Sequence, residues 1–478
     1  MKQLNKTTLD ISKNYPVKVL QFGEGNFLRA FVDFALDTLN KETDFNGAVA
    51  VVQPIEHGLV QLLNEQDGLY TLLQKGVSNG TLVEKQDVIS VIDRSINPFA
   101  DFKAFQQLAF LDSLAFVISN TTEAGIAFDK HDTYDGNPSK SFPGKLTYLL
   151  HQRYLHFDGD LNKGLTIIPC ELINHNGDQL KKCIEQYCTL WGLSDDFLSW
   201  VQKANSFHNT LVDRIVPGYP KNEAEQLNAG FGYEDKLIVS AEAFFLWVIE
   251  GDDALKQKLP FNKTNLNVKF VDSIQPYRNR KVRILNGIHT AMVPFCYLHG
   301  LRTVKESIDD SSTGAFIQKT VFEEIIPSVD MDKAELEEYA NEVFDRFRNP
   351  FIVHKLESIA LNSISKFKVR VLPSILSFYE KFDKLPKRLS LAFASLLVFY
   401  QGKFNGENMP LNDDDQVISF FTKAWEEENL EKAVEIILSN EEIWGQDLTT
   451  INGLHALICT FITDIQVSGV QATYTKLF

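Results

Sequence analysis

Residues 17–31, VKVLQFGEGNFLRAF, decide how the first part of this chain folds. An apolar run of strand length at 17–22 leads into Gly23 and Gly25, and an apolar repeat of helical period follows. A second apolar run, AVAVVQ, comes at 48–53. A strand, a glycine turn, a helix and a second strand form a βαβ unit, so we predict the start of a dinucleotide-binding fold.

The glycine turn departs from the common fingerprint. It reads G-x-G-x-x-x-R-A, with Leu28 where a third glycine would permit close contact between helix and strand. Gly23 can form the tight turn, and Gly25 can let a pyrophosphate approach the helix N-terminus. Arg29 is expected to face phosphate or solvent. At the end of the second strand, Gln53 neither repels a 2′-phosphate nor supplies a charged acceptor, so these residues leave NAD and NADP both open.

The alternation of strands and helices continues to about residue 275. The strand that begins at 114 runs into Thr121, Thr122 and Glu123. Because the carboxyl ends of strands face the ligand in a doubly wound sheet, we expect these three residues beside the cofactor. Thr122 and Glu123 would alternatively cap a helix. The expected elements are a hairpin at 68–94, helices at 99–110, 144–158 and 178–191, and strands at 114–119, 165–170 and 266–273.

From residue 276 onward, helical periodicity dominates. We therefore predict an α/β fold with two domains: a Rossmann-like dinucleotide-binding domain at 1–275 and a mostly α-helical domain at 276–478. The predicted helices of the second domain lie at 276–298, 332–348, 364–382, 386–401, 413–426, 430–440 and 448–466.

Composition and charge narrow the possible partners. The net charge of -16 over 478 residues disfavours nucleic acid and anionic membranes, yet it allows a small anionic substrate in a local basic pocket. No apolar run reaches the roughly 18 residues of a membrane helix, and the polar N-terminus has no signal-peptide core. The five cysteines lack a C-x-x-C pair, which fits a reducing cytoplasm, and the ten histidines lack an H-E-x-x-H motif, so we expect no metal. An oligomer is possible but is not predicted.

A second informative stretch is KVRILNGIHTAM at 281–292. Lys281, Asn286 and His289 interrupt its apolar helical face. At the α-helical 100° per residue, His289 lies roughly 80° and Asn286 roughly 140° round from Lys281, so all three project into one sector. A lysine that loses hydration gives up its proton more readily, and an amide can donate to an oxygen that gains charge. This set suits the interconversion of a carbonyl and an alcohol, although a solvated helix edge would carry the same residues.

Four segments together resemble the polyol-specific long-chain dehydrogenases, the mannitol dehydrogenase family. QFGEGNFLRAF resembles the family's G-x-G-x-F-x-R-A turn, and ISNTTEAGI resembles its S-x-T-E-x-G loop. LVDRIVP resembles V-D-R-I-x-P, and KVRILNGIH matches the catalytic pattern K-x-x-x-x-N-x-x-H. The segments occur in the family order and span nearly the whole chain. The resemblance implies an NAD-dependent oxidoreductase that acts on CH–OH groups without a metal.

The resemblance also assigns roles to individual residues. Lys281 becomes the general acid and base, Asn286 the donor to the reacting oxygen, and His289 the residue that orients a substrate hydroxyl. Asp213 would bind substrate, although a charged Asp213–Arg214 pair inside an apolar segment is more often a structural ion pair. The cofactor would contact Phe22, Gly23, Gly25, Asn26, Phe27, Arg29, Gln53, Thr121, Thr122 and Glu123.

One segment departs from the polyol pattern. Polyol dehydrogenases carry C-D-N where this chain has Cys170, Glu171 and Leu172, and Leu172 cannot hydrogen-bond a substrate oxygen. The C-E-L-I form resembles the hexuronate branch of the family, which interconverts D-tagaturonate and D-altronate with NAD(H) in galacturonate breakdown. A uronate needs a cation for its carboxylate, and Lys366 stands where the family places a substrate-binding arginine.

Alternative functions remain open at this point. Within the family, they are the reduction of fructuronate and the oxidation of mannitol or mannitol phosphate. From another class, a nucleotide-sensing protein could use a catalytically dead dehydrogenase scaffold.

Overall fold

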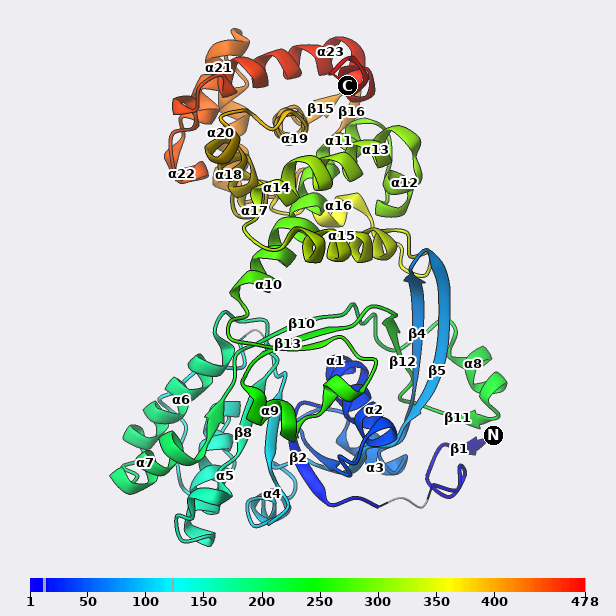
Figure 1. Ribbon diagram of the computed structural model, residues 1–478, viewed down its shortest axis with the longest axis vertical. Helices are drawn as coiled ribbons and strands as arrows, with labels where there is room; N and C mark the ends of the chain where they lie inside the picture. Colours follow the sequence, from blue (N-terminus) through cyan, green and yellow to red (C-terminus); the bar gives the residue numbers. More distant parts are fainter. Residues whose placement is uncertain (12–13, 123, 478) are drawn as a thin grey trace. The chain divides into compact units, whose positions relative to one another are not determined.

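The computed structural model describes residues 1–11, 14–122 and 124–477 (Figure 1). The chain divides into two compact units, one of residues 1–75 and 83–274 and the other of 76–82 and 275–478. The first unit has a parallel sheet with helices, and the second is almost entirely helical, so the predicted fold class is confirmed. The sequence did not indicate that residues 76–82 group with the second unit.

A six-stranded parallel sheet forms the centre of the first unit. Its strands lie in the order β6-β3-β2-β7-β8-β9. Counted along the chain this is 3-2-1-4-5-6, the order of dinucleotide-binding folds, and the strand order reverses between β2 and β7. A ligand is expected at the carboxyl ends of the strands near that reversal. The strands are β2 (Val17–Phe22), β3 (Ala48–Val52), β6 (Ile92–Ile96), β7 (Phe116–Ser119), β8 (Thr166–Pro169) and β9 (Ser206–Phe207).

Different helices cover the two faces of this sheet, as strand β2 shows. The Gln21 amide points to one face, where it donates to the Asp33 carboxylate at 3.2 Å. The Phe22 ring points to the other face and packs against Phe105 and Phe142. The first face carries α1 (Asn26–Leu28), a π-helical turn (Arg29–Asp33) and α2 (Phe34–Glu42); the second carries α4 (Phe102–Leu108), α5 (Phe142–His156) and α6 (Asn176–Leu190).

Residues 68–94 hold more than the predicted hairpin. The hairpin turns through Asn79 and Gly80, whose φ values of 50° and 71° suit a tight two-residue turn. The chain then forms β6, which pairs with β3 at the edge of the parallel sheet. Asp93 and Arg94 are charged residues of the kind that edge strands often carry. Because they interrupt the apolar pattern, the sequence did not predict this strand. The hairpin strands are β4 (Tyr70–Ser78) and β5 (Thr81–Ile89).

Three further strands form a small sheet of the first unit, in the order β10-β13-β14. The middle strand is antiparallel to β10 and parallel to β14. Only the last of them was predicted, at 266–273. The strands are β10 (Thr210–Asp213), β13 (Leu246–Glu250) and β14 (Val268–Val271).

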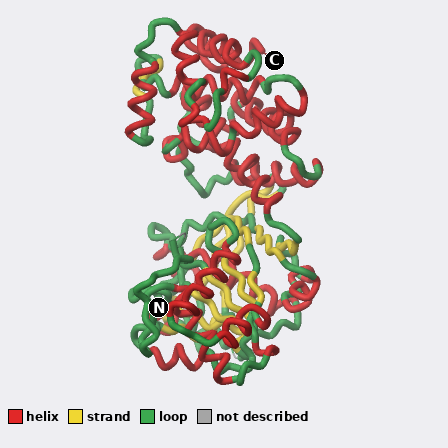
Figure 2. Tube along the Cα trace, turned by 90° about the vertical axis from the view of Figure 1, so that its left-hand side faces the viewer, coloured by secondary structure: helices red, strands yellow, loops and turns green. Residues whose placement is uncertain are grey.

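Helices make up nearly all of the second unit (Figures 1 and 2). The predicted helix at 276–298 is present, but a π-helical turn (Lys281–Asn286) interrupts it between α10 (Gln275–Arg280) and α11 (Gly287–Leu298). Helix α11 packs against α19 (Lys387–Phe399), which is buried from Arg388 to its end.

The predicted helix at 364–382 is two helices. They separate at Val371, because Pro373 lacks the amide N–H that a continuous helix would use there. The two helices are α17 (Ser363–Arg370) and α18 (Leu372–Phe382), and other long helices of this unit are α13 (Ser311–Thr320), α15 (Lys333–Phe347), α20 (Asp415–Ala424), α21 (Leu430–Leu438) and α23 (Leu454–Leu477).

Within the described residues, no helix is long and apolar enough to cross a membrane.

Candidate active site

Gly23 closes the tight turn at the end of β2. Its φ of +116° lies in the region that favours glycine, and its N–H donates to the Val52 carbonyl on β3 at 3.0 Å. A Cβ here would lie 2.8 Å from the Asn120 carbonyl oxygen and 2.8 Å from Leu28 Cδ1. Leu28 therefore packs directly over the turn, and any larger residue at Gly23 would displace backbone at the end of β7.

Gly25 precedes the helix and faces open space. Its φ of -68° does not require glycine, and a Cβ there would meet no atom within 4 Å. The helix that starts at Asn26 thus presents its N-terminal N–H groups to an open volume, which is the arrangement that binds a diphosphate. Gly25 fits a dinucleotide because it leaves access to those groups.

Arg29 faces neither phosphate nor solvent, so that prediction is wrong. Its side chain is 2% exposed. Its guanidinium donates to the Glu24 carbonyl at 3.2 Å, the Leu237 carbonyl at 2.5 Å and the Asn26 side chain at 2.7 Å, and it lies over the Tyr70 ring. Arg29 therefore holds the glycine turn in place from beneath the surface.

The two aromatic residues of the turn pack into the protein. Phe22 is fully buried, with its ring 4.8 Å from that of Phe142. Its side chain supports the strand end, so a contact of Phe22 with the cofactor, which stays a prediction, would have to come from its backbone. Phe27 is partly buried and stacks on Phe31 with 5.0 Å between the ring centroids.

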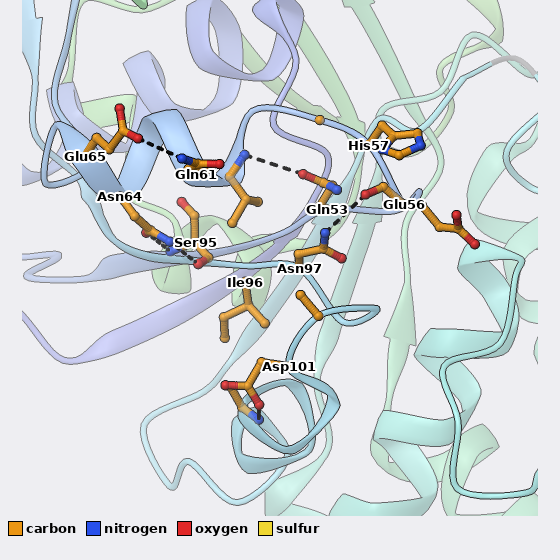
Figure 3. Close-up of a pocket in the computed structure, with 14 residues that line it drawn as sticks. Gln53, Glu56, His57, Gln61, Asn64, Glu65, Ser95, Ile96, Asn97 and Asp101 are labelled. Atoms are coloured by element: carbon orange, nitrogen blue, oxygen red, sulfur yellow. Dashed lines mark hydrogen bonds between the residues drawn. The ribbon is translucent and has the colours of Figure 1, made fainter.

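A cavity of about 880 Å³ opens at the carboxyl ends of β3 and β6 (Figure 3). In this strand order it occupies the place where the adenosine half of a dinucleotide lies. Gln53 lines it, but the Gln53 amide donates to the Ile55 carbonyl at 2.8 Å and accepts from the Val60 N–H at 3.4 Å. Gln53 therefore shapes the loop after β3. The cavity wall also includes Glu56, His57, Asn64, Ser95, Asn97 and Asp101.

A carboxylate beside Gln53 comes from Glu24, between the two glycines. A Cβ on Gly58 would lie 2.0 Å from Glu24 Oε1 and 2.6 Å from Gln53 Oε1, so both oxygens crowd the space above Gly58. Burial raises the pKa of Glu24, and its own N–H, the Leu59 N–H and the Arg29 charge oppose that rise. The turn thus carries an acid to the end of β3, a role that the linear motif did not reveal.

Glu171 fixes the loop after β7, and sequence reasoning assigned it no role. Its carboxylate accepts hydrogen bonds from Ser119 Oγ at 3.0 Å, from the Thr121 N–H at 3.0 Å and from Thr121 Oγ1 at 3.1 Å. Burial raises the pKa of Glu171. Because the Asn120 N–H donates to the Phe22 carbonyl at 3.1 Å, the loop and Thr121 lie against the glycine turn.

The neighbouring predictions have different outcomes. Thr122 is exposed and does not cap a helix, since the next helix in the described part of the chain begins at Phe142. Glu123 lies outside the described residues.

Leu172 is 60% exposed after the end of β8, so an apolar side chain lies at the surface where polyol relatives carry an amide.

In the helical unit, Lys281 and Asn286 begin and end the π-helical turn. A π turn closes hydrogen bonds between residues five apart, and these two residues are five apart. Our α-helical geometry, which separated them by roughly 140°, is therefore wrong here, and the wider turn brings them nearer to one face. Such turns within α-helices frequently mark functional sites.

The side chain of Asn286 is available to a ligand. It is half-buried, and no described residue hydrogen-bonds its amide, while its backbone carbonyl accepts from Thr290 Oγ1 at 2.9 Å. Lys281 is also half-buried. A Cβ on Gly287 would lie 3.0 Å from the Arg370 carbonyl, so glycine lets the end of α17 press against this turn.

His289 is packed among aromatic rings in the helical unit. Its ring stacks on Phe347 at 4.2 Å and lies edge-on to His354 at 5.1 Å. Burial, followed by the charges of His354, Arg346 and Arg370, lowers the pKa of His289 well below its ordinary value. Its buried Nε2 has no hydrogen-bond partner among the described residues. These properties suit a side chain that hydrogen-bonds a ligand hydroxyl.

Asp213 and Arg214 do not form the predicted ion pair. Asp213 ends β10 and is 4% exposed. Arg214 follows it and donates to the Ala30 carbonyl at 2.6 Å, the Gln74 side chain at 2.6 Å and the Glu242 carbonyl at 2.9 Å. Successive residues of an extended chain point to opposite sides, which separates the two charges.

Lys366 lies on α17 of the helical unit. Its Nζ donates to the Ile359 carbonyl at 3.0 Å. Burial, followed by the Arg370 charge, lowers the pKa of Lys366, and the Asp413 charge raises it.

Among the described residues, no three His, Cys, Asp or Glu side chains gather in a way that could hold a metal ion.

Two family models match most of the chain. The mannitol dehydrogenase Rossmann domain matches residues 17–263, and the mannitol dehydrogenase C-terminal domain matches residues 273–466. The chain belongs to the mannitol dehydrogenase family. The resemblance carried by the four sequence segments is thereby confirmed.

Two relatives are similar to this chain over nearly its full length. An altronate oxidoreductase of Bacillus subtilis (strain 168) is 46% identical over 98% of this chain and 97% of the relative. An altronate oxidoreductase of Shigella flexneri is 43% identical over the whole of both chains.

Solved structures share the fold of this family member. D-sorbitol dehydrogenase in substrate-free form has a TM-score of 0.79 at 21% identity, covering 98% of this chain and 99% of that chain. The Pseudomonas fluorescens mannitol 2-dehydrogenase ternary complex with NAD and D-mannitol has a TM-score of 0.66 at 22% identity, covering 99% of both chains.

Alanine substitutions at the two turn glycines should separate cofactor access from folding. Gly25→Ala meets no atom, so the thermal midpoint should stay unchanged while the Kd for NADH rises by about tenfold or more. Gly23→Ala should lower the midpoint, because strained backbone costs on the order of 1–3 kcal/mol. Scanning fluorimetry and NADH titration measure both effects. Unchanged NADH affinity in Gly25→Ala would place the diphosphate elsewhere.

Proposed function

We propose that this family member catalyses the reversible NAD(H)-dependent reduction of D-tagaturonate to D-altronate in galacturonate breakdown. Full-length identities of 46% and 43% to altronate oxidoreductases support this substrate. The π turn carries the chemistry, because it brings Lys281 and Asn286 towards one face of the helix. His289 follows Asn286 by three residues, on α11. We place the reaction in the cytoplasm, which agrees with five free cysteines among the described residues.

The first unit offers the features that NAD requires. The open N-terminus of the helix at Asn26 would hold the diphosphate, Gly25 would give access to it, and the cavity lined by Gln53 would hold the adenosine. Thr121, fixed by Glu171, would border the nicotinamide half. When bound, the cofactor supplies the hydride in reduction and accepts it in oxidation.

Lys281 and Asn286 act on the oxygen that changes between ketone and alcohol. In reduction, the Lys281 ammonium donates a proton to that oxygen as it becomes a hydroxyl. In oxidation, the neutral Lys281 amine removes the hydroxyl proton. The Asn286 amide donates a hydrogen bond to the same oxygen while its negative charge develops, a role worth about 2.7–4 kcal/mol for one donor.

The remaining residues orient the sugar acid. His289 hydrogen-bonds a substrate hydroxyl through its buried Nε2, which has no partner among the described residues. Lys366 supplies positive charge for the carboxylate, and Asp213 accepts from a substrate hydroxyl. Because Leu172 offers no amide, Asn286 carries the polarisation of the carbonyl that polyol relatives share between two asparagines.

The Glu24 carboxylate is our candidate acceptor for the adenosine ribose. It stands beside Gln53 at the end of β3, where dinucleotide-binding folds place an acid that accepts from ribose hydroxyls. A carboxylate at this place also repels the extra phosphate of NADP, and this gives the preference for NAD that Gln53 does not explain.

Glu24→Gln should weaken NADH binding, because a charge-assisted hydrogen bond to the ribose is lost. It should also lower the ratio of the Kd for NADPH to the Kd for NADH by about tenfold or more, because the repulsion of the extra phosphate of NADPH is lost as well. Fluorescence titration with both cofactors measures the ratio. Glu65→Gln is the matched control, since Glu65 is an exposed acid of the same cavity that pairs with Gln61. An unchanged ratio in Glu24→Gln would remove Glu24 from cofactor selection.

Steady-state NADH oxidation with tagaturonate, fructuronate and fructose, run side by side, tests the proposed function. We expect the highest kcat/KM with tagaturonate. Lys281→Ala should lower kcat by about 10²- to 10⁴-fold while NADH binding stays near normal, since the lysine moves only the proton. A higher kcat/KM with fructuronate or fructose would reassign the substrate, and failure with all three would favour a nucleotide-sensing role.

A further inference from the structure

Two cations stand one turn apart on helix α17, next to the π turn. Lys366 and Arg370 are four residues apart, so their side chains lie on the same helix face. Like charges at this spacing destabilise a helix. The Ile359 carbonyl and the Asp413 charge offset this repulsion at Lys366, and an anion between the two cations would offset it at Arg370 as well.

The Arg370 guanidinium has no partner within the described residues. It is half-buried and makes no hydrogen bond or ion pair there, and burial lowers its pKa with no opposing acidic neighbour. Arg283 shows the usual alternative, because its guanidinium donates to Ser374 Oγ at 2.6 Å and to the Pro373 carbonyl at 3.0 Å. A partly buried charge without such acceptors calls for a ligand that supplies them.

The backbone places Arg370 at the reacting residues. Its carbonyl lies 3.0 Å from the position of a Cβ on Gly287, between Asn286 and His289 in the chain. The charges of Arg370 and Arg346 both act on His289, whose buried Nε2 has no hydrogen-bond partner in the described part of the chain. An anion bound here would therefore lie within reach of the groups that handle the substrate hydroxyls.

We propose that Arg370 binds the carboxylate of the sugar acid and so distinguishes a keto-uronate from a neutral ketose, an inference that rests on the proposed function. Guanidinium presents two parallel N–H donors that match the two oxygens of a carboxylate, whereas the Lys366 ammonium adds only a point charge. Arg370 is thus the principal contact, and Lys366 strengthens the local positive potential. A neutral ketose carries a hydroxymethyl group instead and gains nothing from either charge.

The test compares Arg370→Gln, Arg370→Lys and wild type with two substrates: tagaturonate, and the ketohexose with a hydroxymethyl group in place of its carboxylate. Arg370→Gln should raise KM for tagaturonate by about 10- to 100-fold with little change in kcat. Its kcat/KM for the ketohexose should stay within about twofold. Arg370→Lys should fall between, because it keeps the charge and loses the bidentate geometry.

Lys368→Gln is the matched control, because Lys368 lies on the same helix but donates to the Glu442 carbonyl at 3.2 Å. It should leave both substrates unaffected. An unchanged thermal unfolding midpoint verifies that each variant is folded, and if Arg370→Gln is not, Arg370→Lys decides the question alone. An unchanged ratio of the two kcat/KM values would overturn the role of Arg370 and leave the proposed function standing. A wild-type enzyme that reduces neither substrate would instead refute the proposed function.

Discussion

The π-helical turn from Lys281 to Asn286 is the constraint on which the account of the active site depends. Hydrogen bonding between residues five apart brings the ends of this turn towards one face, whereas a regular α-helix would turn Asn286 away from Lys281. Gly287 is the next residue, and a Cβ at this position would lie only 3.0 Å from the Arg370 carbonyl oxygen. The lack of a side chain therefore lets the end of α17 approach closely. The turn, the end of α17 and the ring of His289 are therefore positioned together, and a change at any of them should disturb the others.

Local charge in the helical unit opposes the charge of the whole chain. The protein carries a formal charge of -16, yet the charges of Arg346 and Arg370 both act on His289, and the charge of Arg370 also acts on Lys366. Burial is the first cause that lowers the pKa of His289, and the charges of His354, Arg346 and Arg370 lower it further. In the first unit, the Glu24 carboxyl lies beside Gln53 at the end of β3.

Local patterns predicted the fold well because its decisive contacts are close in sequence. The strand, glycine turn and helix from Val17 onward needed only adjacent residues to be recognised. Strand β6 was missed because Asp93 and Arg94 interrupt its apolar pattern at a sheet edge. The roles of Arg29 and Glu171 were hidden because their partners, Leu237 and Thr121, are distant along the chain. The spacing of five between Lys281 and Asn286 was visible, but its meaning required the observed widening of the helix.

The central claim is that Lys281 and Asn286 act on one oxygen. A double-mutant cycle of single-turnover NADH oxidation, with Lys281→Ala, Asn286→Ala and the double variant, tests it most directly. Residues that act as a unit lose function non-additively, so the double variant should be slower than the slower single variant by less than about tenfold. Losses that multiply in the double variant would show that the two side chains act independently, and this would contradict the account.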